Sequence, residues 1–162
     1  MSKPVRHVGI LSIIAGLVMM IAGASVWGVI TSQLAAEKIT VPADSKMLPG
    51  DDVNGPFSAY AQAEIINEHA LKASEGKTYA ELGALATEAK AKGDQALADK
   101  YTAQRTTVMN GSFLRASLFT SVLAYGVAAM AIGVGLMLGL IGWALTNAAG
   151  RVAPAAVAVK KA

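Results

Sequence analysis

The sequence predicts an all-α membrane protein: a two-transmembrane-helix antiparallel hairpin with a small helical extracytoplasmic segment between the spans. Two long uncharged runs, residues 8–30 and 116–145, each exceed the roughly 20 apolar residues that a helix needs to cross a bilayer. All eleven acidic residues lie between these runs, whereas both ends of the chain are basic. The pattern therefore predicts two spans that enclose a water-exposed middle segment.

The first span covers residues 8–30 and follows a short tail, residues 1–7, that carries Lys3 and Arg6. Short Lys/Arg-rich flanks stay in the cytoplasm, so we expect this tail inside the cell. A cleaved signal peptide is the alternative, because the AGA motif at 22–24 imitates a cleavage site. An h-region covers only about 7 to 15 residues, however, so the length of the run favours a retained span.

Residues 31–112 are predicted to form the extracytoplasmic segment, which carries eight Lys/Arg against the eleven acidic residues. A nucleic-acid face clusters basic with aromatic side chains, and this segment has no such cluster, which excludes nucleic acid as a partner. The chain has no cysteine and therefore no disulfide. A segment of this size has a marginal core, so we expect it to pack against the membrane helices or a partner.

Within this segment, residues 32–55 are expected to form an irregular arm, because proline and glycine punctuate them and only KITV gives a short extended run. The next stretch, FSAYAQAEIINEHALKAS, contains no helix breaker and predicts a helix that Gly76 ends. The apolar stripe expected on this helix is Ala59, Ala63, Ile66, Ala70 and Ala73.

A second outer helix is predicted after Thr78, because Glu81 follows at the spacing of a capping box. Its expected apolar face consists of Tyr79, Leu82, Ala86 and Ala89. A third helix starts at Asp94, passes through Leu97, Tyr101 and Val108, and feeds into the second span. Its weak point is Asn110-Gly111, where we expect a turn or a helix cap rather than a glycosylation site.

The second span is predicted at residues 113–146, and a cytoplasmic basic tail follows at 147–162 with Arg151, Lys160 and Lys161. The uncharged run has about ten residues more than a bilayer needs, so the helix is expected to tilt or to begin above the membrane. Arg115 at its outer end is expected to snorkel to the interface. Trp27 and Trp143 lie where aromatic belts form.

Small side chains mark a helix-packing interface on both spans. Steps of three or four residues along the second span give Ser117, Ser121, Ala124, Ala128, Ala131, Gly135, Gly139 and Gly142. The first span has Gly9, Ser12, Gly16 and Gly23, and its IIAG motif recurs seven residues on as MIAG. Small residues at this spacing let helices approach closely in lipid. Either the two stripes face each other and close the hairpin, or another protein uses at least one of them.

The sequence predicts no catalytic, cofactor-binding or metal site. His7 and His69 fall on opposite sides of the membrane in this topology, which excludes a facial-triad iron site within one chain. Glu64, Glu68 and His69 suggest a lone metal site, but a solvated helix surface is the reading we favour. The span interiors contain no ionisable residue, which argues against a self-sufficient transporter.

Several stretches carry a family resemblance: MSKPVRHVGILSIIAGLVMMIAG, GPFSAYAQAEIINEHAL, GKTYAEL and NGSFLRASLFTSVLAYGVAA. They resemble small two-span membrane proteins of actinobacteria that often bear the label aromatic ring-opening dioxygenase, and the resemblance covers most of residues 1–145. It implies an actinobacterial cell membrane. The histidine count contradicts the inherited dioxygenase label.

Two functions follow as hypotheses. The first is a non-catalytic accessory or structural subunit that packs against a larger membrane assembly, with a respiratory-chain complex as host by analogy. The alternative is an extracytoplasmic ligand-binding or sensing module anchored by the hairpin. The expected partners are membrane lipids and an integral membrane protein, and the expected location is the cell membrane with both termini in the cytoplasm.

Overall fold

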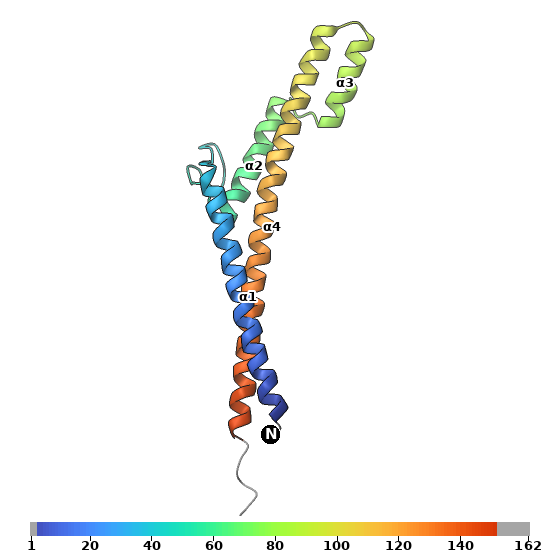
Figure 1. Ribbon diagram of the computed structural model, residues 1–162. Coiled ribbons are helices and arrows are strands. Elements are labelled where there is room, and N and C mark those ends of the chain that lie inside the picture. The colour runs from blue at the N-terminus through green and yellow to red at the C-terminus, as the bar shows by residue number, and fades with distance from the viewer. Residues whose placement is uncertain (1–2, 152–162) are drawn as a thin grey trace, which may run out of the picture. The chain divides into compact units, whose positions relative to one another are not determined.

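The computed structural model describes residues 3–151, so Lys160 and Lys161 of the predicted tail lie outside this range. The chain forms four helices there: α1 (Lys3–Ala36), α2 (Pro56–Ala73), α3 (Tyr79–Ala91) and α4 (Gln95–Arg151) (Figure 1). Within these residues there is no strand, and the predicted all-α fold class is confirmed. Unit 1 comprises α1 up to Val29 and α4 from Tyr125, and unit 2 comprises Ile30–Ala124.

Helices α1 and α4 are both long and apolar enough to cross a membrane. Their most apolar windows have mean hydropathies of 2.3 and 2.1. Only 11% of the α1 window and 17% of the α4 window are buried. In a soluble protein, a helix that is apolar on all sides is buried in the core, so these two helices do not resemble core helices.

Both long helices extend beyond their predicted limits. Helix α1 continues to Ala36, so the arm begins after this residue rather than at Ser32. Helix α4 runs without interruption through Asn110 and Gly111, and the turn predicted there is wrong. A Cβ atom at Gly111 would lie 3.0 Å from the Cβ of Ala70, so glycine at this position allows α2 to approach α4.

The arm, residues 37–55, is more ordered than its proline and glycine content predicts. The N–H groups of Val41 and Val53 donate to the carbonyls of Asp51 and Ile39, each at 2.9 Å. Both valine side chains are only 1% exposed. Two backbone hydrogen bonds therefore join the beginning of the arm to its end, and two buried valines anchor it.

The two short helices begin and end as the sequence predicts. Helix α2 starts at Pro56, and Gly76 follows it with a φ of +76°, which favours glycine. Helix α3 has the predicted capping box: the Glu81 N–H donates to Thr78 Oγ1 at 3.4 Å, and the Thr78 N–H donates to Glu81 Oε2 at 2.7 Å. A second glycine with a φ of +76°, Gly93, separates α3 from α4.

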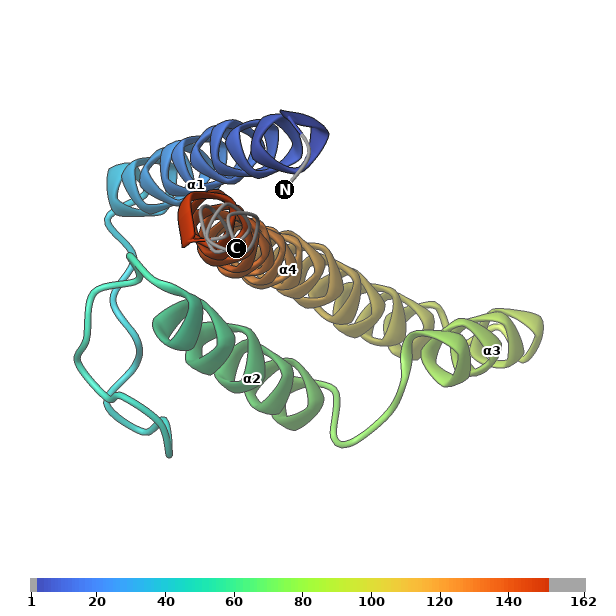
Figure 2. The same cartoon turned by 90° about the horizontal axis from the view of Figure 1, so that it is seen from below.

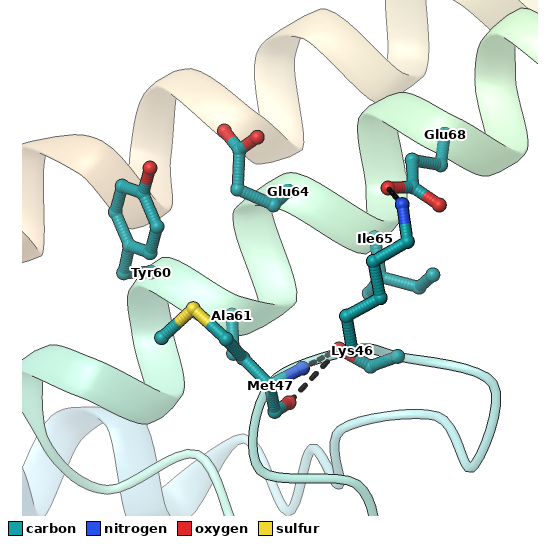
Figure 3. Close-up of a pocket in the computed structure, with 8 residues that line it drawn as sticks. Lys46, Met47, Tyr60, Ala61, Glu64, Ile65 and Glu68 are labelled. Carbon is teal, nitrogen blue, oxygen red and sulfur yellow. Dashed lines mark hydrogen bonds and ion pairs between the residues drawn. The ribbon is translucent and has the colours of Figure 1, made fainter.

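Helix α2 is buried over a wider arc than its predicted stripe. Ala59 and Ala63 are fully buried as expected, but Ala61 and Ile65 are buried too, whereas Ala73 is exposed. Ala61 and Ile65 line a groove between the arm and α2 (Figure 3). Because the arm was expected to be irregular, its contribution to this burial was not predicted.

Helix α3 packs beside the first turns of α4 in unit 2 (Figures 1 and 2). Leu82 is fully buried and Ala89 is 4% exposed, as predicted. Tyr79 is 41% exposed, but its ring lies under the Arg105 guanidinium, 4.0 Å from centroid to Cζ. Gly83 leaves space for this arginine, since a Cβ there would be 3.2 Å from Arg105 Cζ.

Candidate functional site

Unit 1 contains a contact between α1 and α4 in which small residues recur every seven positions (Figures 1 and 2). The contacts pair Gly9 with Gly142, Gly16 with Gly135 and Gly23 with Ala128, and all six residues are buried. Residue numbers rise along α1 as they fall along α4. A seven-residue period keeps one face of a helix toward its neighbour in the left-handed crossing typical of coiled coils.

The backbones in this contact are too close for any larger side chain. A Cβ atom at Gly135 would lie 2.6 Å from the carbonyl oxygen of Gly16 and 3.0 Å from the backbone nitrogen of Met20. A Cβ at Gly23 would lie 2.7 Å from the carbonyl oxygen of Ala128. Since these neighbours are backbone atoms, they cannot rotate away, and glycine is what permits the approach.

Two side-chain contacts accompany the glycines. Ser12 Oγ donates to the Leu138 carbonyl at 2.9 Å, a hydrogen bond from one helix to the other. The Trp27 and Tyr125 rings meet edge to face with centroids 4.7 Å apart, and Tyr125 is only 1% exposed. Tyr125 is therefore a packing residue.

Gly139 joins this contact only through its backbone. Its nitrogen lies 2.9 Å from a Cβ built at Gly16, but a Cβ on Gly139 itself would meet no atom within 4 Å. A side chain at Gly139 would therefore not separate the helices. Four residues advance a helix face by about 40°, whereas the seven residues from Gly135 to Gly142 return it to within about 20°.

The predicted stripe on α4 is consequently not one continuous face. Ala131 stays near α1, 3.3 Å from a Cβ built at Gly23. Ser117, Ser121 and Ala124 belong to unit 2, where Ser117 is exposed and the other two are half-buried. In unit 1 the small residues of the two helices face each other.

Unit 2 contains a second helix contact, between α2 and α4, that sequence reasoning missed. Besides Gly111 against Ala70, the Tyr60 and Phe119 rings meet edge to face at 5.8 Å. A glycine inside an otherwise helical pattern often has a packing reason, and Gly111 was the available signal.

Arg115 is part of this contact. Its Nη2 donates to Glu64 Oε1 at 3.1 Å, and its guanidinium lies 5.2 Å from the Phe119 ring centroid. The two charged side chains are 35% and 43% exposed. The sequence predicts that Arg115 snorkels to the membrane interface; in the structure its charged group ties α4 to α2.

The three polar side chains suggested as a lone metal site bind three separate partners. Glu64 pairs with Arg115, Glu68 accepts from Lys46 Nζ at 3.1 Å (Figure 3), and His69 Nε2 lies 2.8 Å from Asp44 Oδ2. The hydrogen bond with His69 lowers the pKa of the Asp44 carboxyl. These side chains do not converge on one point, and among the described residues no group of three possible metal ligands occurs.

Two open grooves flank α2. The first, about 190 Å³, is shown in Figure 3 and lies between the arm and α2. It is lined by Ser45, Lys46, Met47, Tyr60, Ala61, Glu64, Ile65 and Glu68. The second, about 410 Å³, lies between α2 and α4 and is lined by Ile66, His69, Ala70, Ala73, Thr107, Asn110, Gly111 and Leu114.

A charge cluster at the turn after α2 predicts sensitivity to acid. Lys100 Nζ on α4 and Lys77 Nζ each donate to Glu75 at 2.9 Å, and these bonds lower its pKa from 4.5 to about 2. A depressed folded-state pKa stabilises the fold above pH 4.5, and this contribution is lost as the pH falls toward 2.

We expect amide exchange in the α2–α3 turn, corrected for its intrinsic rate, to accelerate across this window. The variant Glu75→Gln should exchange faster at neutral pH and lose most of the pH dependence; an unchanged profile would contradict the assignment.

No family model, curated protein or solved structure matches the chain.

Proposed function

We propose that the chain is a non-catalytic integral membrane subunit whose two spans pack against a larger membrane assembly, with a respiratory-chain complex as a host by analogy. The supporting observation is that its two most apolar helices bury so little of their surface. Ile21, Leu123, Met130 and Met137 are each more than 60% exposed. Exposed apolar faces of this extent mark membrane or protein contacts.

The length of the unit 1 contact supports insertion into a bilayer. From Gly9 to Trp27, α1 covers nineteen residues that face Tyr125 to Gly142 on α4. Nineteen residues span about 28 Å of helix, close to a hydrocarbon thickness of about 30 Å. Lipid then covers the outward faces of both helices, and in the low-dielectric core the Ser12 hydroxyl stays satisfied by Leu138.

The proposed topology is an antiparallel hairpin with both termini in the cytoplasm and the middle segment outside. It is supported by the basic termini, by the acidic middle segment and by the opposite residue order in the α1–α4 contact. The basic tails would lie against anionic lipid at about 1 kcal/mol per Lys/Arg.

This topology predicts a labelling pattern for single cysteines in a chain that has none. In intact cells an impermeant thiol reagent should modify Ala84→Cys, at an exposed position on α3, and leave Ser2→Cys and Ala162→Cys unmodified until the cells are opened. Ser2 and Ala162 lie outside the described residues. Ser74 is an unsuitable outer reporter because it is fully buried and bonded to the Lys77 carbonyl at 2.7 Å. Modification of either terminus from outside would refute the topology.

A partner helix has a face of α4 available that α1 does not use. A Cβ at Gly126 or Gly133 would meet no atom within 4 Å, and these glycines are seven residues apart. Met130 and Met137 are exposed on the same side, and methionine adapts to varied packing partners. Small residues beside flexible ones suit close packing against another membrane helix.

The test is co-purification from gently solubilised membranes, followed by identification of every protein that travels with the chain. We expect a discrete complex that Gly133→Leu abolishes while the isolated chain keeps its stability. Gly139→Leu is the matched control, because it adds the same side chain at another open position about 120° round the helix. Wild-type chain that purifies alone from such membranes would count against the accessory role.

A ligand-binding module remains the second candidate, and the 410 Å³ groove is the observation in its favour, since ligand pockets usually measure about 300 to 1,000 Å³. The groove is open, however, and His69 in its wall is engaged by Asp44. A solitary chain that retains a small molecule through purification would favour this function over the accessory role.

A further inference from the structure

We infer that the first turn of α2 is embedded in the outer lipid interface, with Phe57 as its inserted side chain. The inference rests on the proposed membrane insertion of α4, and it assigns a lipid contact to a helix that the sequence predicts to lie in water. It follows from the register of α2 against α4 within unit 2.

The register is given by paired contacts. Glu64 on α2 contacts Arg115 on α4. Tyr60, one turn before Glu64, contacts Phe119, one turn after Arg115. One further turn places Phe57 level with about Val122. This position lies inside the uncharged run that begins at Ala116, so the start of α2 runs alongside a membrane-spanning sequence rather than above it.

Phe57 is the most exposed large apolar side chain of the described residues, at 74%. A single exposed apolar residue is ordinary on a surface in water. Here it lies next to a lipid-facing segment, and the eleven residues from Val53 to Ala63 carry no charge. An aromatic ring at this level has the position of an aromatic-belt residue.

The backbone at this end of α2 is also suited to a poorly hydrated site. A helix start leaves its first N–H groups without intrahelical partners, and Pro56 removes one of them. Ser58 Oγ accepts from the N–H groups of Asn54 and Gly55, each at 3.2 Å. Two backbone donors that would otherwise need water are thus satisfied within the chain.

Charges appear only farther along α2, and they appear in pairs. Glu64 is bound by Arg115, and Glu68 by Lys46. The order from the α2 start is therefore exposed aromatic ring, half-exposed aromatic ring and then ion pairs. This sequence matches the passage from acyl chains through headgroups to water.

The test uses Phe57→Cys, labelled with the polarity-sensitive fluorophore NBD, because the chain contains no native cysteine. The labelled protein is reconstituted in phosphatidylcholine vesicles that contain phosphatidylglycerol and a lipid spin-labelled high on its acyl chain. We expect blue-shifted emission that this lipid quenches strongly. Ala84→Cys on α3 is the aqueous control, and Leu136→Cys on α4, 54% exposed, is the control for a span, quenched by a lipid labelled deep in its chain.

Four outcomes separate the possibilities. Quenching at residue 57 by the shallow label supports the inference. If residue 57 behaves like residue 84 while residue 136 is quenched by the deep label, the chain spans the membrane and the inference is overturned. If residue 136 is not quenched either, the proposed membrane insertion fails, and the inference fails with it. Blue-shifted but unquenched emission at residue 57 would mean a protein contact and would also overturn it.

Discussion

Gly135→Leu is expected to destabilise the α1–α4 contact by about 2 kcal/mol, the upper end of the usual overpacking cost less the gain in helix propensity. Leucine returns close to 1 kcal/mol of helix propensity, and overpacking typically costs about 1–3 kcal/mol even where side chains can move. Here they cannot, because the first added carbon would lie 2.6 Å from the Gly16 carbonyl oxygen and 3.0 Å from the Met20 nitrogen. Separation of the helices would also break the hydrogen bond from Ser12 to Leu138. The net effect is a loss despite the better helix former.

The measurement is the free energy of unfolding in mixed detergent micelles, followed by tryptophan fluorescence, since Trp27 lies against Tyr125. Gly139→Leu is the matched control: it makes the same exchange about one turn away, where a Cβ meets nothing within 4 Å, and it should be neutral or slightly stabilising. Both variants should insert normally, because leucine raises hydropathy. Equal effects of the two variants would show that α1 and α4 do not meet through Gly135.

Leu82→Ala is expected to release α3 from unit 2 at a cost of about 2–5 kcal/mol, the usual range for a buried leucine. The Leu82 side chain is fully buried, with 0% of its surface accessible to solvent. A segment of the size of unit 2 without disulfides has little stability to spare, so this loss should populate an opened state. The contact between Tyr79 and Arg105 should be lost with it.

Hydrogen exchange resolves this effect by segment. In Leu82→Ala, amides of α3 should lose protection, whereas those of α1 and α4 in unit 1 should keep theirs, because the units have separate cores. Leu97→Ala is the control, since Leu97 is 37% exposed and should cost far less. Protection lost equally in unit 1 would mean that the two units unfold together.

Elements whose signal is local were predicted from the sequence. The two apolar helices follow from run length, and the start of α3 follows from Thr78 and Glu81, which satisfy each other three residues apart. The end of α2 follows from Gly76, whose φ is positive. In each case neighbouring residues decide the structure, so no knowledge of distant contacts was needed.

Features that depend on distant contacts were not predicted. The predicted stripe included Gly139 because it was built from steps of three and four residues. The sequence does not show how the two helices cross, and their crossing selects the seven-residue period instead. From the sequence, Gly111 suggests a break in the helix. The structure shows that it makes room for the Ala70 methyl group of α2. The contact of Arg115 with Glu64 was not predicted, because the two residues lie 51 positions apart.

The seven-residue repeat in unit 1 also bears on how the two helices find their alignment. A shift of one repeat, about 10.5 Å, would set Gly16 against Gly142 and Gly23 against Gly135, so pairs of small residues match in more than one alignment. The glycines therefore bring the backbones together but do not distinguish neighbouring alignments. Two contacts that do not repeat distinguish these alignments: the hydrogen bond from the Ser12 hydroxyl to the Leu138 carbonyl, and the edge-to-face contact of the Trp27 and Tyr125 rings. One hydroxyl and one pair of rings thus fix the axial register of the two helices, which the glycines alone would leave undetermined.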